Sequence, residues 1–128
     1  MSLRFKVHYT PTEARALLPD VRNWLDCIEN LSENLREIDE EIDKLQTGGL
    51  DLGGEWVEAR VAVFAEMSLT LREFSSRQIQ IKDLERGLID FPALLDGREV
   101  LLCWEKSEDD IVWWHDLESG YADRQPLF

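Results

Sequence analysis

Apolar residues spaced alternately three and four positions apart dominate the first third of the chain. They are Val21, Trp24, Ile28, Leu31, Leu35, Ile38, Ile42 and Leu45. This heptad spacing places all of them on one helix face, which the helix must bury against a neighbour. We therefore expect a long helix over residues 11–46. Thr10, Pro11 and Glu13 predict its start, because Thr10 and Glu13 can form a capping box and proline is tolerated in a first turn.

A second helix is expected over residues 55–76, after a glycine-rich turn at residues 47–54. The apolar residues expected to pack against the first helix are Val57, Val61, Phe64, Met67, Leu71 and Phe74. The two helices would form an antiparallel hairpin over residues 11–76.

The C-terminal third changes from helical to strand patterns. Short strands are expected at residues 78–82, 88–91, 99–105 and 111–116. Asp96-Gly97 between two apolar runs is the strongest hairpin signal. Pro92 is expected to end its strand, because proline cannot donate a ladder hydrogen bond. Alternating apolar residues at 5–9 predict a further short strand at the N-terminus.

The predicted fold class is α+β, a long antiparallel two-helix hairpin with a small antiparallel sheet. One domain over residues 1–128 would hold the hairpin, a β-meander at 78–116 and a tail at 117–128. The strands at 99–105 and 111–116 are apolar on both faces, so both faces of the sheet should be covered. The helices would cover one face, and the tail or a second copy of the chain would cover the other.

Charge and composition exclude several partners. The chain of 128 residues carries 27 acidic and 14 basic residues, a net charge of −13, which repels nucleic acid and anionic membrane surfaces. No apolar run reaches the roughly 20 residues that a membrane helix needs. Cys27 and Cys103 form no paired motif, and the N-terminus lacks the apolar core of a signal peptide, so we expect a cytoplasmic protein with free thiols.

Aromatic and ionisable residues gather near the C-terminus. The candidate ligand-binding residues are Arg98, Trp104, Trp113, His115 and Arg124. A guanidinium over an indole face serves either packing or anion binding, and both interpretations stay open here. If the stretch is structural, Trp113 or Trp114 should fill the core over Val21.

Catalytic and metal motifs are weak. His115 could act with Asp90, Asp116 or Cys103, but no nucleophile motif surrounds them, so no catalytic residue is assigned. A hydrogen-bonded structural histidine and a small buried Cys103 are the simpler interpretations. His8 and His115 lie far apart without metal-ligand spacing, so we expect no tight zinc site and no cofactor.

Several motifs together resemble a known family. They are Thr12-Glu13-Ala14, Leu17-Leu18-Pro19, residues 87–94, residues 96–104, Trp114-His115-Asp116, Gly120-Tyr121 and Arg124-Gln125-Pro126-Leu127. This pattern is similar to a small bacterial family classed as a domain of unknown function, family 2203. The resemblance spans nearly the whole chain and implies no assigned catalytic or binding residue.

The functional expectation is a non-enzymatic, self-associating or protein-interaction module, with a homodimer as the first partner and another protein as the second. Heptad seams and a sheet apolar on both faces both require burial that one copy does not supply. The alternative is a small-molecule protein that binds an anion at the Trp/His/Arg cluster. A hydrolytic or metal-dependent enzyme ranks third.

Overall fold

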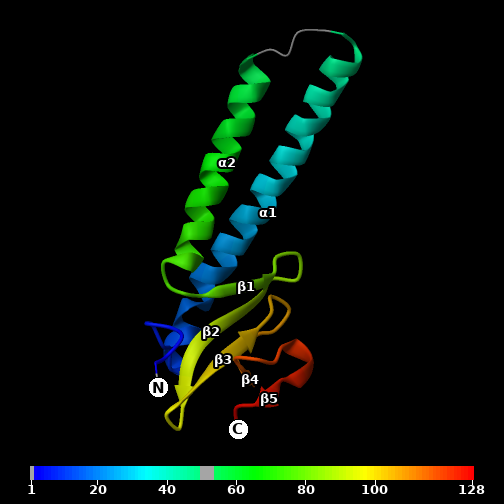
Figure 1. Ribbon diagram of the computed structural model, residues 1–128. Helices are drawn as coiled ribbons and strands as arrows, with labels where there is room; N and C mark the ends of the chain where they lie inside the picture. Colours follow the sequence, from blue (N-terminus) through cyan, green and yellow to red (C-terminus); the bar gives the residue numbers. More distant parts are fainter. Residues whose placement is uncertain (1, 50–53) are drawn as a thin grey trace. The chain divides into compact units, whose positions relative to one another are not determined.

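The structure, a computed structural model, describes residues 2–49 and 54–128 and has the α+β architecture that the sequence predicts (Figure 1). Its elements are the helices α1 (Pro11–Thr47) and α2 (Gly54–Ser75), the strands β1 (Gln80–Asp83), β2 (Leu88–Leu95), β3 (Arg98–Trp104), β4 (Trp113–Asp116) and β5 (Gln125–Pro126), and the 3-10 helix η1 (Tyr121–Asp123). The predicted glycine turn falls partly on residues 50–53, outside the described residues. Neither described helix is long and apolar enough to span a membrane.

Contacts along the chain group into two compact units. One comprises Met1–Asn23 and Phe74–Phe128, and the other comprises Trp24–Glu73. The first unit holds the start of α1 and the whole sheet, and the second holds the remaining part of α1 and most of α2. The expectation of a single domain stays a prediction.

The second unit is an antiparallel helix pair. Cys27 Sγ of α1 lies 3.6 Å from Thr70 Oγ1 of α2, and Asp39 Oδ1 lies 3.0 Å from Arg60 Nε. Residues later in α1 therefore contact residues earlier in α2, which shows that the two helices run antiparallel. This is the predicted hairpin, and the capping box at its start is also formed, because Thr10 and Glu13 exchange hydrogen bonds of 3.0 and 3.1 Å.

The prediction of which face of α2 packs against α1 is largely wrong. Val57, Val61, Phe64 and Leu71 are 44%, 64%, 45% and 38% exposed. Trp56, Ala59 and Val63 instead line a groove shared with α1 residues such as Ile38. Apolar side chains occur on both sides of α2, so periodicity alone does not select the face that α1 covers.

The sheet is a five-stranded antiparallel meander in the order β1-β2-β3-β4-β5. Leu95 pairs with Arg98 across a two-residue turn, in which Asp96 and Gly97 have φ values of 52° and 77°. Two positive φ angles are typical of the turn that matches strand twist, which confirms the Asp-Gly hairpin.

Pro92 does not end its strand, contrary to expectation. β2 continues to Leu95, and Pro92 pairs with Leu101 of β3. The carbonyl oxygen of Pro92 points to the opposite edge, where it accepts a 2.7 Å hydrogen bond from the backbone nitrogen of Tyr9. The ring nitrogen points the same way, and β1 pairs only as far as Asp90 along that edge. The missing proline hydrogen therefore costs no ladder bond.

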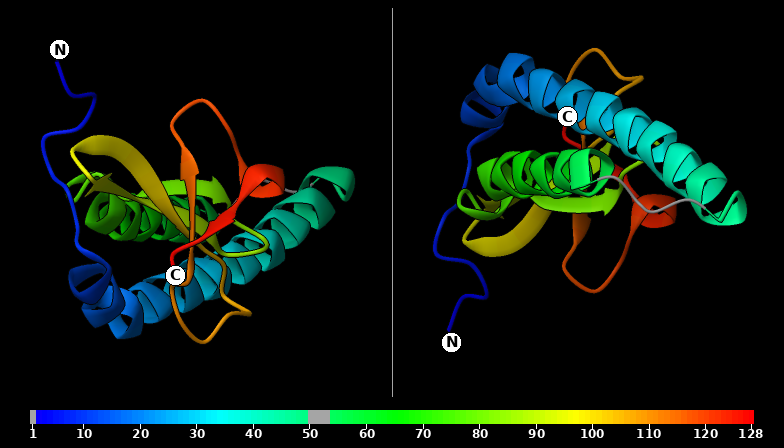
Figure 2. Two further views of the ribbon diagram at one scale, coloured as in Figure 1. Left: turned by 90° about the horizontal axis from the view of Figure 1, so that it is seen from below. Right: turned by 90° about the horizontal axis from the view of Figure 1, so that it is seen from above.

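The predicted strand at residues 5–9 is also wrong. The segment is an irregular trace in Figure 2, and side chains take the place of a strand partner. Glu99 accepts hydrogen bonds from the backbone nitrogens of Arg4 and Phe5, and Gln78 Oε1 accepts those of Lys6 and Val7. These acceptors satisfy backbone donors that a ladder would otherwise pair.

The start of α1 covers one face of the sheet. The Arg22 guanidinium lies 4.9 Å from the ring centre of Trp104, and it donates to the carbonyls of Lys106 and Glu108. Trp104 is fully buried, whereas Trp113 and Trp114 are only half-buried. The core tryptophan is thus Trp104 rather than either of the two we expected.

The tail covers the opposite face. Figure 2 shows it returning beside β4, and β5 pairs with Trp113 and Trp114. Arg124 stacks on Trp113, at 4.7 Å from its ring centre. One of the two predicted covers for this face, the tail, is therefore present.

Candidate functional site

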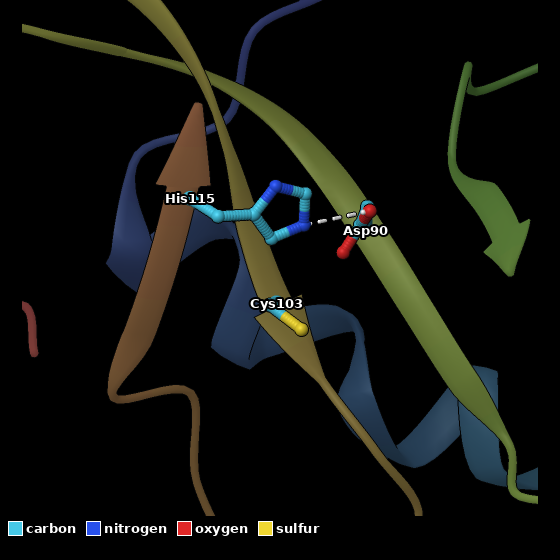
Figure 3. A group of neighbouring side chains, drawn as sticks. All are labelled: Asp90, Cys103 and His115. Atoms are coloured by element: carbon cyan, nitrogen blue, oxygen red, sulfur yellow. Dashed lines mark hydrogen bonds and ion pairs between the residues drawn. The ribbon is translucent and has the colours of Figure 1, made fainter. Parts of the chain in front are cut away.

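Three neighbouring strands bring together Asp90, Cys103 and His115 (Figure 3). Asp90 pairs with Cys103, and His115 pairs with Leu101, two positions before Cys103. Directly opposed residues, and residues two apart, share a face of a sheet. The three side chains therefore project from the face opposite α1. Their potential ligand atoms lie within 4.8 Å of one another, and all three residues are at least 98% buried.

His115 is fixed at both ring nitrogens. Nδ1 lies 2.8 Å from the carbonyl oxygen of Asp116, and Nε2 lies 3.0 Å from Asp90 Oδ2. A carbonyl only accepts, so Nδ1 carries a hydrogen and donates it. One hydrogen then lies between Nε2 and Asp90 Oδ2 in their 3.0 Å contact.

Asp90 is the unusual member of the cluster. Burial raises the pKa of its carboxyl group, while His115 and Lys82 act in the opposite direction. Its second oxygen, Oδ1, is buried and has no hydrogen-bond partner among the described residues. An unsatisfied buried carboxylate oxygen costs about 1–3 kcal/mol or more, so its persistence points to a missing donor or cation.

Cys103 is protonated at neutral pH. Burial, followed by the nearby Asp90, raises the pKa of its thiol to about 12, although Arg124 favours the thiolate. A nucleophilic cysteine needs a lowered pKa and a base that faces it. His115 instead directs both nitrogens to Asp90 and Asp116. The arrangement is not that of a Cys-His catalytic pair.

A small pocket opens directly onto the three side chains. Its volume is about 180 Å³, and its lining consists of Lys82, Leu88, Asp90, Cys103, His115, Ser119, Gly120 and Tyr121. The segment after β4 supplies Ser119, Gly120 and Tyr121. The tail thus covers this face without filling it.

Arg124 lies beside the cluster, as part of the predicted binding group. Its guanidinium forms an ion pair of 2.7 Å with Glu108 and lies 4.4 Å from the ring centre of Tyr121. Nη1 also lies 3.9 Å from Cys103 Sγ. The guanidinium is mostly buried, and these partners hold it against the thiol.

The other predicted binding residues do not join this pocket. Arg98 stacks over Trp114 and forms an ion pair with Asp116. Trp104 faces α1, and its indole nitrogen donates to the carbonyl oxygen of Glu108. The structure therefore gathers His115, Arg124 and Trp113 on one face and leaves Arg98 and Trp104 on the other. Ligand binding by any of the five stays a prediction.

From the sequence we considered Asp90 and Cys103 as catalytic partners of His115, and Cys103 also as a small buried residue, but we did not predict that the three side chains form one cluster. A signal for Asp90 was available, because it is a lone charged residue inside the apolar run Leu88-Ile89-Asp90-Phe91. A carboxylate in a strand that is buried on both faces needs a partner.

The donor set suits a transition-metal ion. Thiolate, imidazole and carboxylate are all zinc ligands, at about 2.0–2.3 Å from the metal. Nδ1 of His115 donates to a backbone carbonyl, a hydrogen bond that commonly orients metal-binding histidines and leaves the lone pair on Nε2. The three ligand atoms would need to approach one another only modestly to share one ion.

Comparisons with known proteins add the family. No curated protein and no solved structure matches this chain. A family profile does match, over residues 7–127, and it includes every residue of the cluster and of the pocket lining. The chain belongs to the family described as Uncharacterized conserved protein (DUF2203).

Proposed function

We propose that the protein binds a divalent transition-metal ion of the zinc class through Asp90, Cys103 and His115. The observation that supports this most is Asp90 Oδ1, a buried oxygen without a partner among the described residues, beside an imidazole and a thiol. This proposal departs from the expectation drawn from sequence spacing, which detects ligands only when they are close together in the sequence.

Charge balance supports the metal. An ion of charge +2 would be neutralised by the Asp90 carboxylate and the Cys103 thiolate, with His115 as a neutral ligand. Binding would displace the thiol proton and the proton shared with Asp90. Arg124, 3.9 Å from Sγ, would remain as a hydrogen-bond donor to the thiolate.

The competing interpretation is purely structural. A buried His-Asp pair with a small apolar thiol would only hold three strands together. Such a pair accounts for Oδ2, which contacts His115, and leaves Oδ1 at most the weak thiol donor of Cys103. A metal ion would give the Asp90 carboxylate a stronger partner.

Cobalt titration of metal-free protein separates the two interpretations, because a cysteine thiolate bound to Co²⁺ gives a near-ultraviolet charge-transfer band. In the parent we expect the band to saturate at one equivalent of Co²⁺, and in Cys103→Ser we expect no band. Cys27→Ser is the matched control, because Cys27 is exposed and lies in the other unit. His115→Gln should weaken binding and His8→Gln should not, since His8 pairs with Glu99 instead.

Zinc should also raise the melting temperature of the metal-free parent, because a ligand at 100 times its Kd stabilises a fold by about 2.7 kcal/mol. Circular dichroism checks that each variant is folded. A folded parent that gives neither the cobalt band nor a zinc-dependent shift would leave the structural interpretation standing.

A second function, self-association, is favoured by the exposed side of α2. Val57, Val61, Phe64 and Leu71 form an exposed apolar stripe with spacings of four, three and seven. A second copy of α2, antiparallel about Phe64, would place Val57 against Leu71. The next residues, Glu58 and Arg72, would then lie near each other with opposite charge, as a self-complementary interface requires.

Light scattering at micromolar and higher concentration tests this homodimer. We expect a dimer mass for the parent and a monomer mass for Val61→Glu, since Val61 is the most exposed member of the stripe. Glu66→Lys changes charge off the stripe and is the matched control. A monomeric parent at high concentration would remove the proposal.

A further inference from the structure

We infer that the metal site has an open fourth coordination position, which faces the pocket beside Lys82 and takes a small carboxylate-type monoanion. This inference rests on the metal binding proposed above and adds the class of exchangeable ligand.

The ligand count gives the first argument. The described residues contribute three donor side chains to this cluster, namely Asp90, Cys103 and His115. Structural zinc sites normally have four protein ligands, whereas sites with three keep a position for water or substrate. An ion held here would lack one protein ligand.

The direction of the open position gives the second argument. The strands β2, β3 and β4 form the floor beneath the three side chains, and α1 lies beyond that floor (Figure 3). The pocket of about 180 Å³ is lined by the same three side chains. A fourth ligand would therefore enter from the pocket.

The size of the pocket limits this ligand. A water molecule occupies about 30 Å³ in the liquid, so the pocket has room for roughly six waters. Formate and acetate fit such a space together with one or two waters. Benzoate is larger than either anion, and its ring would contact the walls formed by Leu88 and Tyr121.

Charge selects an anion. An ion of charge +2 with a thiolate, a carboxylate and a neutral imidazole has no net charge. Lys82 lines the pocket and forms no ion pair with any residue in the described ranges, so it adds one positive charge at the opening. Arg124 adds none, because it is paired with Glu108. One uncompensated positive charge matches one monoanion.

The wall also offers polar contacts. Ser119 Oγ donates to the carbonyl oxygen of Asp116, and the Tyr121 hydroxyl donates to Glu105. Both hydroxyl hydrogens are therefore committed. Among the side chains of the described lining residues, the donor left for a carboxylate is the Lys82 ammonium, which would pair with one oxygen while the other oxygen binds the metal.

The experiment uses the cobalt-loaded full chain and follows its visible absorption during titration with formate, acetate and benzoate. We expect formate and acetate to change the spectrum with saturation, and benzoate to require higher concentrations for the same change. Lys82→Met should weaken acetate binding about tenfold, as expected for a lost hydrogen bond between charged groups. Lys82→Arg should restore much of it.

Lys44→Met is the matched control, because Lys44 pairs with Glu41 in the other unit. A thiolate-to-cobalt band that no anion perturbs would overturn the open-position inference and leave the metal site intact. Acetate binding that is equal in the parent and in Lys82→Met would overturn the role of Lys82. The absence of the thiolate band itself would overturn the metal proposal, and this inference with it.

Discussion

Asp90 and His115 face each other across β3, with Oδ2 and Nε2 3.0 Å apart, although 25 positions separate them in the chain. Both side chains are almost completely buried, at 2% and 3% exposed. Their contact crosses one face of β3 and joins its two neighbouring strands, β2 and β4. It is the structural centre of the candidate site and the first place to test its energetics.

Replacing Asp90 with Ala should destabilise the metal-free protein by about 3–5 kcal/mol, the usual cost of removing one partner from a buried ionic pair. The remaining His115 would keep only its bond to Asp116. Urea unfolding in the presence of a chelator gives the value. Asp109→Ala, on an exposed loop, should change stability by less than about 0.5 kcal/mol. Equal values for the two variants would contradict a coupled buried pair.

The two cysteines should differ sharply in reactivity. Iodoacetamide at pH 8 should label Cys27 in the folded, metal-free protein and spare Cys103, because burial raises the pKa of the Cys103 thiol to about 12 and also blocks access. Mass spectrometry of the labelled peptides measures this. In denaturant both thiols should react at similar rates. Rapid labelling of Cys103 in folded protein would count against the buried arrangement.

The N-terminal segment should loosen in acid through Glu99. Although burial acts the other way, the hydrogen bonds from His8, Phe5 and Arg4 lower the pKa of Glu99 below its usual 4.5. A carboxyl group with a lowered folded-state pKa stabilises the fold above its unfolded-state pKa, and this contribution is lost as pH falls through the folded-state value.

Glu99→Gln should therefore lower the melting temperature at pH 7, and the difference from the parent should shrink below about pH 4.5. Thermal unfolding across pH measures the effect. Glu118→Gln removes an exposed ion pair with Arg4 and should have little effect, since such pairs contribute about 0–1 kcal/mol. A Glu99→Gln deficit that stays constant down to pH 3 would contradict the assignment.

Truncation of Trp104 and of Trp114 should affect stability to different extents. Trp104→Ala should cost about 3–5 kcal/mol as the deletion of a fully buried aromatic, and it also removes the ring beneath Arg22. Trp114→Ala should cost clearly less, because its ring is half-buried and stacks on the exposed Arg98 side chain. Chemical denaturation of both variants gives the ranking, and a reversed order would contradict the assignment of Trp104 as the core tryptophan.

Local signals in the sequence were sufficient to predict both helices and the four strands β1 to β4. The capping box at Thr10, the heptad seam of α1 and the Asp96-Gly97 turn all depend on residues within a few positions of one another, and each is present in the structure. Such features follow from backbone geometry and period, which a single sequence displays directly. The α+β class and the family membership follow from the same pattern.

Tertiary structure alone decided which faces meet. Apolar residues surround α2, so only packing shows that Trp56 rather than Val57 lies against α1. Pro92 does not end β2 because its ring nitrogen lies on the strand edge that faces Tyr9, where no ladder bond is lost. No local pattern in the sequence predicts which edge that is.

The candidate site depends on the same kind of information. Asp90, Cys103 and His115 belong to three different strands and resemble no ligand motif in sequence. Strand register brings them onto one face, and register is set by pairing across the sheet rather than by the residues next to each ligand. Periodicity and turn residues alone were enough to predict the helices, the hairpin and the buried character of these strands. The juxtaposition of a carboxylate, a thiol and an imidazole was decided by the fold, because it arises from contacts between residues that are distant along the chain.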